Sequence, residues 1–205
     1  MNIIGETVVA FLLTTAPEMD AAGMGERAKI QPPIRFDRDR DALWQGIRDR
    51  TISVVGTDSL TYTAEDRNSP DFWDCRVGLH IQGADTLSLM YDEGVRNRRI
   101  DLVTLVKILS ENAARLYGLF PAKGAIFPGA DADLVVFDPN RSVSLGAERY
   151  LGHTDYSIWE DRHARGVAVM TFLHGELVIQ DGEVTKASPA GRHLLDRGDL
   201  RAGRP

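Results

Sequence analysis

The sequence predicts an α/β fold that is followed, from about residue 120, by a small β module. In the first half, short apolar runs rich in β-branched residues alternate with segments of helical periodicity. After residue 120 the pattern changes to short strands separated by turn residues, with Asp181-Gly182 as a strong hairpin signal. The chain has 205 residues, 43% of them hydrophobic, and is therefore long enough to bury a substantial core.

Two strands and a helix are predicted near the start of the chain. Residues 7–14 read TVVAFLLT, an apolar and β-branched run that favours a buried strand. The Pro32-Pro33 pair predicts an extended segment, because proline does not fit a helix interior. Residues 38–49 carry apolar side chains at helical spacing and predict a helix, and residues 52–55 predict a second strand.

A long loop and two helices are expected next. Residues 60–83 are polar with little periodicity, and a loop of this length in a compact domain is usually functional or disordered. Residues 85–93 and 101–117 show helical spacing of apolar side chains. Asp101 is the expected N-cap of the second helix, and Gly118 its stop signal.

The last third predicts strands and a tail. Residues 124–129 and 133–138 are expected to be strands, and residues 167–173 and 176–180 to form a hairpin. The charged segment 188–205 is expected to be an extended tail that is ordered only where it docks.

Charge and cysteine content exclude several classes of protein. Lys and Arg number 24 against 30 for Asp and Glu, so the net charge of −6 argues against non-specific nucleic-acid binding. Cys75 is the single cysteine, which excludes an intramolecular disulfide and a cysteine metal cage and fits a reducing compartment. The early apolar run 8–13 is too short for a membrane span and lacks the basic flank of a signal peptide. We therefore expect a cytoplasmic protein with no membrane partner.

Asp58 is the sharpest candidate for chemistry. It follows an apolar strand, and α/β barrels place catalytic groups at the carboxyl ends of their strands. A carboxylate there can bind a divalent metal and accept a proton from water. The alternative is an Asp that caps the following turn through its own side chain.

The five histidines form no ligand motif of their own. None of them lie in an HxH or HExxH arrangement, so a self-contained zinc site is unsupported. His80 lies in the long loop, where we expect solvent exposure, with a position facing a pocket as the alternative. His174 lies in the predicted hairpin turn and is expected to be structural.

Five blocks of the sequence, in order, resemble the cyclic amidohydrolases of the hydantoinase and dihydropyrimidinase family. They are Gly5-Glu6-Thr7 with Phe11-Leu12-Leu13, Pro32-Pro33-Ile34-Arg35 with Asp41-Ala42-Leu43-Trp44, the ISVVGTD run that ends at Asp58, the two helical segments 85–95 and 110–119, and Lys123-Gly124 through Asp138. The resemblance runs over nearly the full length of the chain.

This resemblance implies a fold and a division into domains. Residues 1–120 would be the C-terminal part of a TIM-like (β/α)8 barrel, with its last strands and helices. Residues 121–187 would be a small β-sandwich module, and residues 188–205 the charged tail. Because a complete barrel typically needs about 250 residues, we expect the barrel to be incomplete in this chain.

The resemblance also implies an activity. Enzymes of this family open a cyclic amide with water activated between two divalent metals, usually zinc, which are bridged by a carboxylated lysine. Asp58 would be both a metal ligand and the catalytic residue that moves the proton. Gln31, where the family usually has Ser, and His80 would contact the substrate.

The other metal ligands of the family lie upstream of the matched blocks, and the residue after the aspartate, usually His, is Ser59 here. We therefore expect zinc or another divalent metal to be held mainly by residues outside this chain.

Three interpretations follow. The chain could be the small subunit of a split hydrolase for hydantoin-like or dihydropyrimidine-like substrates. A second polypeptide with the N-terminal barrel half and an HxH motif would then complete it, in a homo- or hetero-oligomer. It could instead be a non-catalytic structural or regulatory relative, or a truncated inactive fragment.

Overall fold

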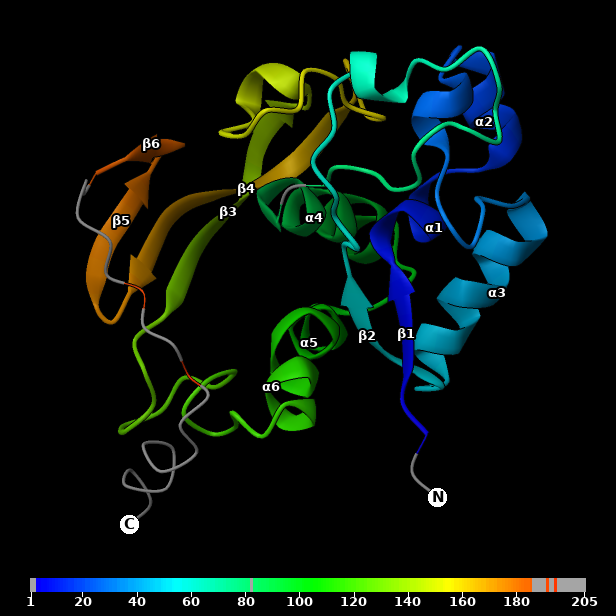
Figure 1. Cartoon of the computed structure of the whole chain (residues 1–205). Helices are drawn as coiled ribbons and strands as arrows, with labels where there is room; N and C mark the ends of the chain where they lie inside the picture. Colours follow the sequence, from blue (N-terminus) through cyan, green and yellow to red (C-terminus); the bar gives the residue numbers. More distant parts are fainter. Residues whose placement is uncertain (1–2, 82, 186–190, 192–193, 195–205) are drawn as a thin grey trace.

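Two sheets, one parallel and one antiparallel, form the framework of the molecule (Figure 1). The structure, a computed structural model, describes residues 3–81, 83–185, 191 and 194. In the first sheet, β1 (Gly5–Val8) and β2 (Ile52–Gly56) run parallel, with Glu6 opposite Val54. Both strands point the same way in Figure 1, so their carboxyl ends lie at the same edge.

The chain turns directly from β1 into a buried helix, α1 (Val9–Leu13). The strand predicted over residues 7–14 is therefore wrong beyond Val8. Four of the five residues of α1 are buried, and a short run that is apolar on all sides suits a buried helix as well as a buried strand. The next helix, α2 (Ala16–Ala21), begins with a capping box, in which Thr15 N–H donates to Glu18 Oε2 over 2.8 Å.

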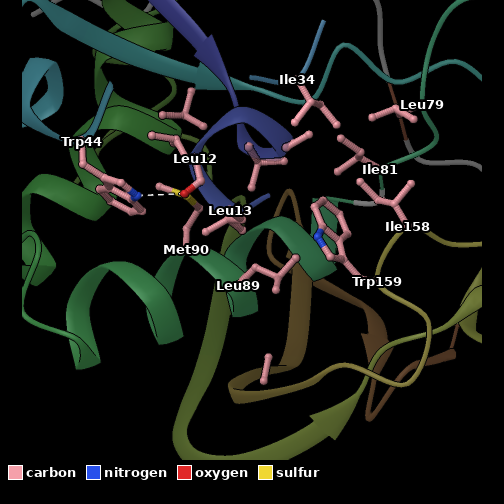
Figure 2. Packing of buried hydrophobic residues seen from close by; sticks show 14 of the residues in the cluster. Leu12, Leu13, Ile34, Trp44, Leu79, Ile81, Leu89, Met90, Ile158 and Trp159 are labelled. Carbon is pink, nitrogen blue, oxygen red and sulfur yellow. Dashed lines mark hydrogen bonds between the residues drawn. The ribbon is translucent and has the colours of Figure 1, made fainter. Parts of the chain in front are cut away.

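The helix predicted over residues 38–49 is confirmed as α3 (Asp37–Arg48). Its apolar stripe buries Trp44 and Ile47 against α1. The Trp44 indole N–H donates to the Leu12 carbonyl oxygen over 2.8 Å (Figure 2). The predicted strand at residues 52–55 follows as β2.

Hydrogen bonds from one buried guanidinium hold the long polar loop, over residues 60–81, in a defined conformation. It contains the short helix η2 (Glu65–Arg67) and lies next to η1 (Gly25–Ala28). The fully buried Arg67 guanidinium donates to the carbonyl oxygens of Arg76 (2.5 Å), Glu26 (2.6 Å) and Lys29 (2.8 Å). The loop thus obtains its order from hydrogen bonds rather than from a regular element.

Both predicted helices after the loop are present and contain π-helical stretches. The first, α4 (Gly83–Leu89) with η3 (Met90–Arg96), extends beyond both predicted ends. The second comprises α5 (Leu102–Val106), η4 (Lys107–Glu111) and α6 (Asn112–Leu116). Asp101 is its N-cap, as predicted, since Asp101 Oδ1 accepts from Thr104 N–H over 2.7 Å, and Gly118 follows its end.

The last third forms an antiparallel sheet in the order β3-β4-β5-β6. Its strands are β3 (Leu134–Ser144), β4 (His163–Leu173), β5 (Glu176–Gln180) and β6 (Glu183–Val184). The predicted hairpin across His174-Gly175 is confirmed as β4–β5.

The strand predicted over 124–129 is wrong, because this segment forms turns and leaves Ile126 87% exposed. The second sheet of a sandwich is not among the described residues and stays a prediction. The predicted tail 188–205 lies outside the described residues except for Gly191 and Leu194.

One hydrophobic cluster joins both halves of the chain. Between β3 and β4 the chain passes through η5 (Ala147–Arg149) and returns to the core, where Ile158 and Trp159 pack with Leu13 and Leu89 (Figure 2). The segment between β3 and β4 therefore packs into the same hydrophobic core as the α/β part of the chain. Within the described part of the chain, no helix has the length and apolarity to cross a membrane.

Candidate functional site

Asp58 lies two residues beyond the carboxyl end of β2, as the sequence predicts. Its side chain is exposed, and its φ of 48° is in the left-handed region, which residues with a Cβ rarely enter. Val54 and Gly56 belong to one face of β2, because side chains alternate along a strand, and Asp58 follows beyond the end of the strand. The Asp58 carboxylate is thus available to a ligand at the edge where β1 and β2 end.

A second carboxylate, which the sequence analysis did not single out, belongs to β1. Glu6 of β1 is opposite Val54, and paired residues project to the same side of a sheet. A Cβ added to Gly56 would come within 2.4 Å of Glu6 Oε1, so the Glu6 carboxylate lies over the space that Gly56 leaves open. Glu6 therefore lies over Gly56, which precedes Asp58 by two residues, but nothing in the sequence near Glu6 indicates this contact.

Ser59 connects the end of β2 to residues 79–81. Ser59 bridges Leu79 in parallel pairing, and Leu60 N–H donates to the Leu79 carbonyl oxygen over 2.8 Å. The Ser59 hydroxyl oxygen accepts the Ile81 N–H over 3.0 Å. Residue 59 is therefore held by both backbone and side-chain contacts directly beside Asp58.

His80 is half-buried, so the expected solvent exposure of this residue is wrong. Its Nδ1 lies 3.3 Å from Ser59 Oγ and 3.4 Å from Thr61 Oγ1, and its ring packs edge-on against Tyr150 at 4.7 Å between centroids. Among the described residues, the buried Nε2 has no hydrogen-bond partner. Burial lowers the pKa of His80, which favours the neutral imidazole.

Gln31 is exposed, in the extended segment predicted at the two prolines. The Lys29 carbonyl oxygen accepts the Gly78 N–H over 3.0 Å, so the segments that carry Gln31 and His80 are joined two residues from each. Substrate contact by Gln31 and His80 stays a prediction.

A buried polar group lies in α4, directly after the loop that carries His80. Asp85 is fully buried in α4, with Arg149 Nε at 3.6 Å from its Oδ1. Burial raises the pKa of Asp85, while the Arg149 charge opposes that shift. Burial also raises the pKa of Tyr150 to about 12, and its hydroxyl is 2.7 Å from Ser157 Oγ. These groups therefore support the His80 loop from inside the core.

An apolar hollow of about 640 Å³ lies on the other face of β2. Val55 and Thr57 line it together with Leu105 and Leu109 of the helical segment and Phe137 of β3. Because Val55 alternates with Val54 and Gly56, this hollow and the Glu6 carboxylate belong to opposite faces of the sheet.

An acidic cluster near His174 is neutralised by a lysine. Single ligand atoms of Asp131, Asp133 and His174 lie within 4.8 Å of one another. Lys123 Nζ lies 2.9 Å from Asp131 and also pairs with Asp133. Burial lowers the pKa of Lys123, but the hydrogen bonds with Asp133 and Asp131 outweigh it and raise the pKa, so the ammonium stays charged. The cluster is thus compensated by a cation of the chain itself, in line with the structural role expected for His174.

The residues beside Asp58 fit a divalent metal only in part. Exposed carboxylate oxygens are suitable ligands, but zinc sites take three or four protein ligands, often histidines. His80, which contacts the neighbouring Ser59, turns Nδ1 toward two hydroxyls and keeps Nε2 buried. Asp58 can therefore supply one ligand, and a complete site needs others.

Comparison with known proteins shows clear relatives. The model of the Amidohydrolase family matches residues 25–178. D-phenylhydantoinase from Escherichia coli O1:K1 / APEC is 36% identical over 193 residues, which are 92% of this chain and 41% of the relative.

Solved structures agree with this result. Dihydropyrimidinase from Brevibacillus agri NCHU1002 superposes with a TM-score of 0.84 at 28% identity, over 90% of this chain and 41% of that one. D-hydantoinase from Bacillus sp. AR9 gives a TM-score of 0.84 at 31% identity over the same shares. The chain thus spans about two fifths of the length of the relatives that it matches.

Proposed function

Because this chain belongs to the amidohydrolase family and is of the hydantoinase type, we propose that it is one part of a metal-dependent cyclic amidohydrolase. In this proposal β1 and β2 are the last strands of a (β/α)8 barrel, and the antiparallel sheet is its companion module. A second polypeptide with an HxH motif supplies the other strands and most metal ligands. The substrate is a cyclic amide or ureide, such as a hydantoin or a dihydropyrimidine.

One observation supports this proposal most directly. The Asp58 carboxylate is exposed, two residues beyond the carboxyl end of a parallel strand. In barrels this is the edge at which catalytic groups lie.

The chemistry assigned to Asp58 is a proton transfer. The bound divalent metal, which we propose to be zinc, supplies the Lewis acid for the attack of water on the ring carbonyl carbon. Asp58 accepts one proton of that water at a carboxylate oxygen while the new C–O bond forms. It then donates this proton to the ring nitrogen as the C–N bond breaks. Gln31 and His80, on the two joined loop segments, contact the substrate ring in this proposal.

The test is reconstitution with a second chain. This chain would be co-expressed with the polypeptide of the same genome that carries an HxH motif and the remaining barrel strands. The purified complex is expected to contain divalent metal and to open 5-phenylhydantoin or dihydrouracil. Asp58→Asn is expected to abolish ring opening, because Asn cannot accept the proton. Asp49→Asn, a matched change at an exposed helix end, is expected to leave it intact.

A second candidate is a non-catalytic relative, favoured by Ser59 in place of the family's usual His and by the lack of a complete ligand set among the described residues. A metal-containing complex whose ring opening survives Asp58→Asn would remove the proposed role of Asp58. A folded, metal-free chain that forms no complex with such a polypeptide would favour the non-catalytic alternative.

A further inference from the structure

We infer that Ser59 and His80 are positioning residues that hold Asp58 in its left-handed conformation and so direct its carboxylate toward the reacting atoms. The inference rests on the proposed function, because it assigns a purpose to the geometry of Asp58. The contacts that support it join the segment after β2 to the loop that precedes α4. We refer to them as the Ser59–His80 clamp, meaning the contacts of Ser59 with residues 79–81 and of His80 with Ser59 and Tyr150.

The backbone of Asp58 has a left-handed conformation. Its φ of 48° is in the left-handed region, which Asp enters more readily than most residues with a Cβ but still at a cost that its neighbours can offset. On one side Asp58 is joined through Thr57 to the end of β2, which pairs with β1. On the other side it is joined to residue 59.

Residue 59 is held by contacts with residues 79–81, which serve as an anchor. Ser59 pairs with Leu79, and the Leu60 N–H donates to the Leu79 carbonyl oxygen over 2.8 Å. The Ser59 hydroxyl oxygen also accepts the Ile81 N–H over 3.0 Å. Leu79 and Ile81 are buried in the hydrophobic core (Figure 2), so the anchor is attached to a rigid part of the molecule.

His80 lies between these two core residues in the sequence. The Ser59 oxygen accepts the Ile81 N–H, so its own proton can be donated to His80 Nδ1 at 3.3 Å, and Thr61 Oγ1 lies 3.4 Å from the same nitrogen. The imidazole also packs edge-on against Tyr150, whose hydroxyl is 2.7 Å from Ser157 Oγ. The imidazole therefore fixes the rotation of the Ser59 hydroxyl, and the hydroxyl fixes residue 59 beside Asp58.

The clamp is tested first on the chain by itself, by NMR. The three-bond HN–Hα coupling and the chemical shifts of Asp58 report its φ, and hydrogen exchange reports the Ile81 amide. Ser59→Ala is expected to move Asp58 out of the left-handed region and to speed exchange at Ile81. Ser59→Thr keeps the hydroxyl and is expected to restore both. His80→Phe keeps a ring against Tyr150 without Nδ1 and is expected to shift Asp58 in the same direction as Ser59→Ala.

Ser69→Ala is the matched control, since Ser69 lies in the same loop and its hydroxyl accepts only a local contact from the Asp71 N–H at 3.3 Å among the described residues. It is expected to leave the Asp58 coupling unchanged.

The second test uses the complex with the HxH polypeptide. Ser59→Ala is expected to lower kcat for ring opening by about 10²-fold, the effect of a displaced catalytic group, with little change in KM. Ser59→Thr is expected to recover most of kcat.

Each outcome decides one point. An unchanged Asp58 conformation in Ser59→Ala overturns the clamp, and a changed conformation with an unchanged kcat overturns its positioning role. If the wild-type complex opens no ring, the proposed function fails, and the conformation of Asp58 alone then decides whether the clamp exists.

Discussion

The indole N–H of Trp44 donates to the carbonyl oxygen of Leu12 over 2.8 Å, inside the core and across 32 residues of sequence. Leu12 belongs to α1, and Trp44 lies on the buried stripe of α3. The bond satisfies a carbonyl near the end of a short helix, where intrahelical donors are lacking. It thus joins the helix that follows β1 to the helix that precedes β2.

Trp44→Phe is expected to lower the free energy of unfolding by about 2 kcal/mol, because the Leu12 carbonyl would stay buried without its donor. Urea denaturation followed by circular dichroism measures this change. Trp73→Phe is the matched control. Trp73 is 83% exposed, so its replacement is expected to change stability by less than about 0.5 kcal/mol. Equal losses in the two variants would contradict the role given to the Trp44 bond.

Arg67→Met is expected to loosen the long loop. The change removes the donors of four carbonyl groups and is expected to cost roughly 2–4 kcal/mol. It should also speed cleavage within residues 60–83 in limited proteolysis, which mass spectrometry locates.

Arg38→Met serves as its control, because the Arg38 side chain is 84% exposed and has only a 3.8 Å ion pair with Asp39 among the described residues. This variant should keep the wild-type cleavage rate. If both arginine variants were cleaved alike, the anchoring by Arg67 would be refuted.

We expect that replacing Gly166 of β4 with any larger residue destabilises the fold. Its φ is 97°, and an added Cβ would meet Phe137 at 2.4 Å and Tyr91 at 2.5 Å. Those two rings pack edge-to-face at 4.9 Å and connect η3 to β3. Gly166→Ala should therefore lower the free energy of unfolding by at least about 1 kcal/mol. Thermal unfolding by calorimetry provides the measurement.

Gly152→Ala is the control for that experiment. Gly152 is exposed, and an added Cβ would have no atom within 4 Å. Its replacement is expected to leave the unfolding temperature unchanged or to raise it slightly. A similar loss at both glycines would indicate that the aromatic pair tolerates the methyl group.

Asp85 is expected to give the stability a distinct pH dependence. Its pKa is raised by burial above the ordinary value of 3.8, with the Arg149 charge opposing. The folded state then binds the proton more tightly than the unfolded chain does. The stabilisation is thus present below the unfolded pKa and is lost as the pH rises through the folded pKa. Asp85→Asn should therefore gain stability relative to wild type from acidic to neutral pH, as urea denaturation over that range would show.

Asp101→Asn should show the opposite slope. Hydrogen bonds from Thr104 lower the pKa of Asp101, so its stabilisation is present above the unfolded pKa and is lost as the pH falls. This variant is expected to lose stability relative to wild type as the pH rises toward neutral. Identical pH profiles for Asp85→Asn and Asp101→Asn would contradict the assignment for Asp85.

Local signals predicted the elements whose stabilising contacts are local. The helix α3 and the N-cap Asp101 follow from side-chain spacing and from a hydrogen bond three residues away. The β4–β5 hairpin follows from its turn residues. Residues 9–13 and 124–129 were assigned wrongly, because an apolar run does not reveal whether its backbone pairs with a neighbouring strand or with itself.

The sequence by itself determined the resemblance to the hydantoinases, the position of Asp58 at the end of a strand and the order of most elements. Only the tertiary structure decided that Glu6 lies over Gly56, that Ser59 contacts His80, and that Lys123 neutralises the acidic cluster beside His174. The physical reason is the same in each case. These contacts join residues from separate elements, and which side chains meet depends on the packing of those elements, which spacing along the chain does not encode.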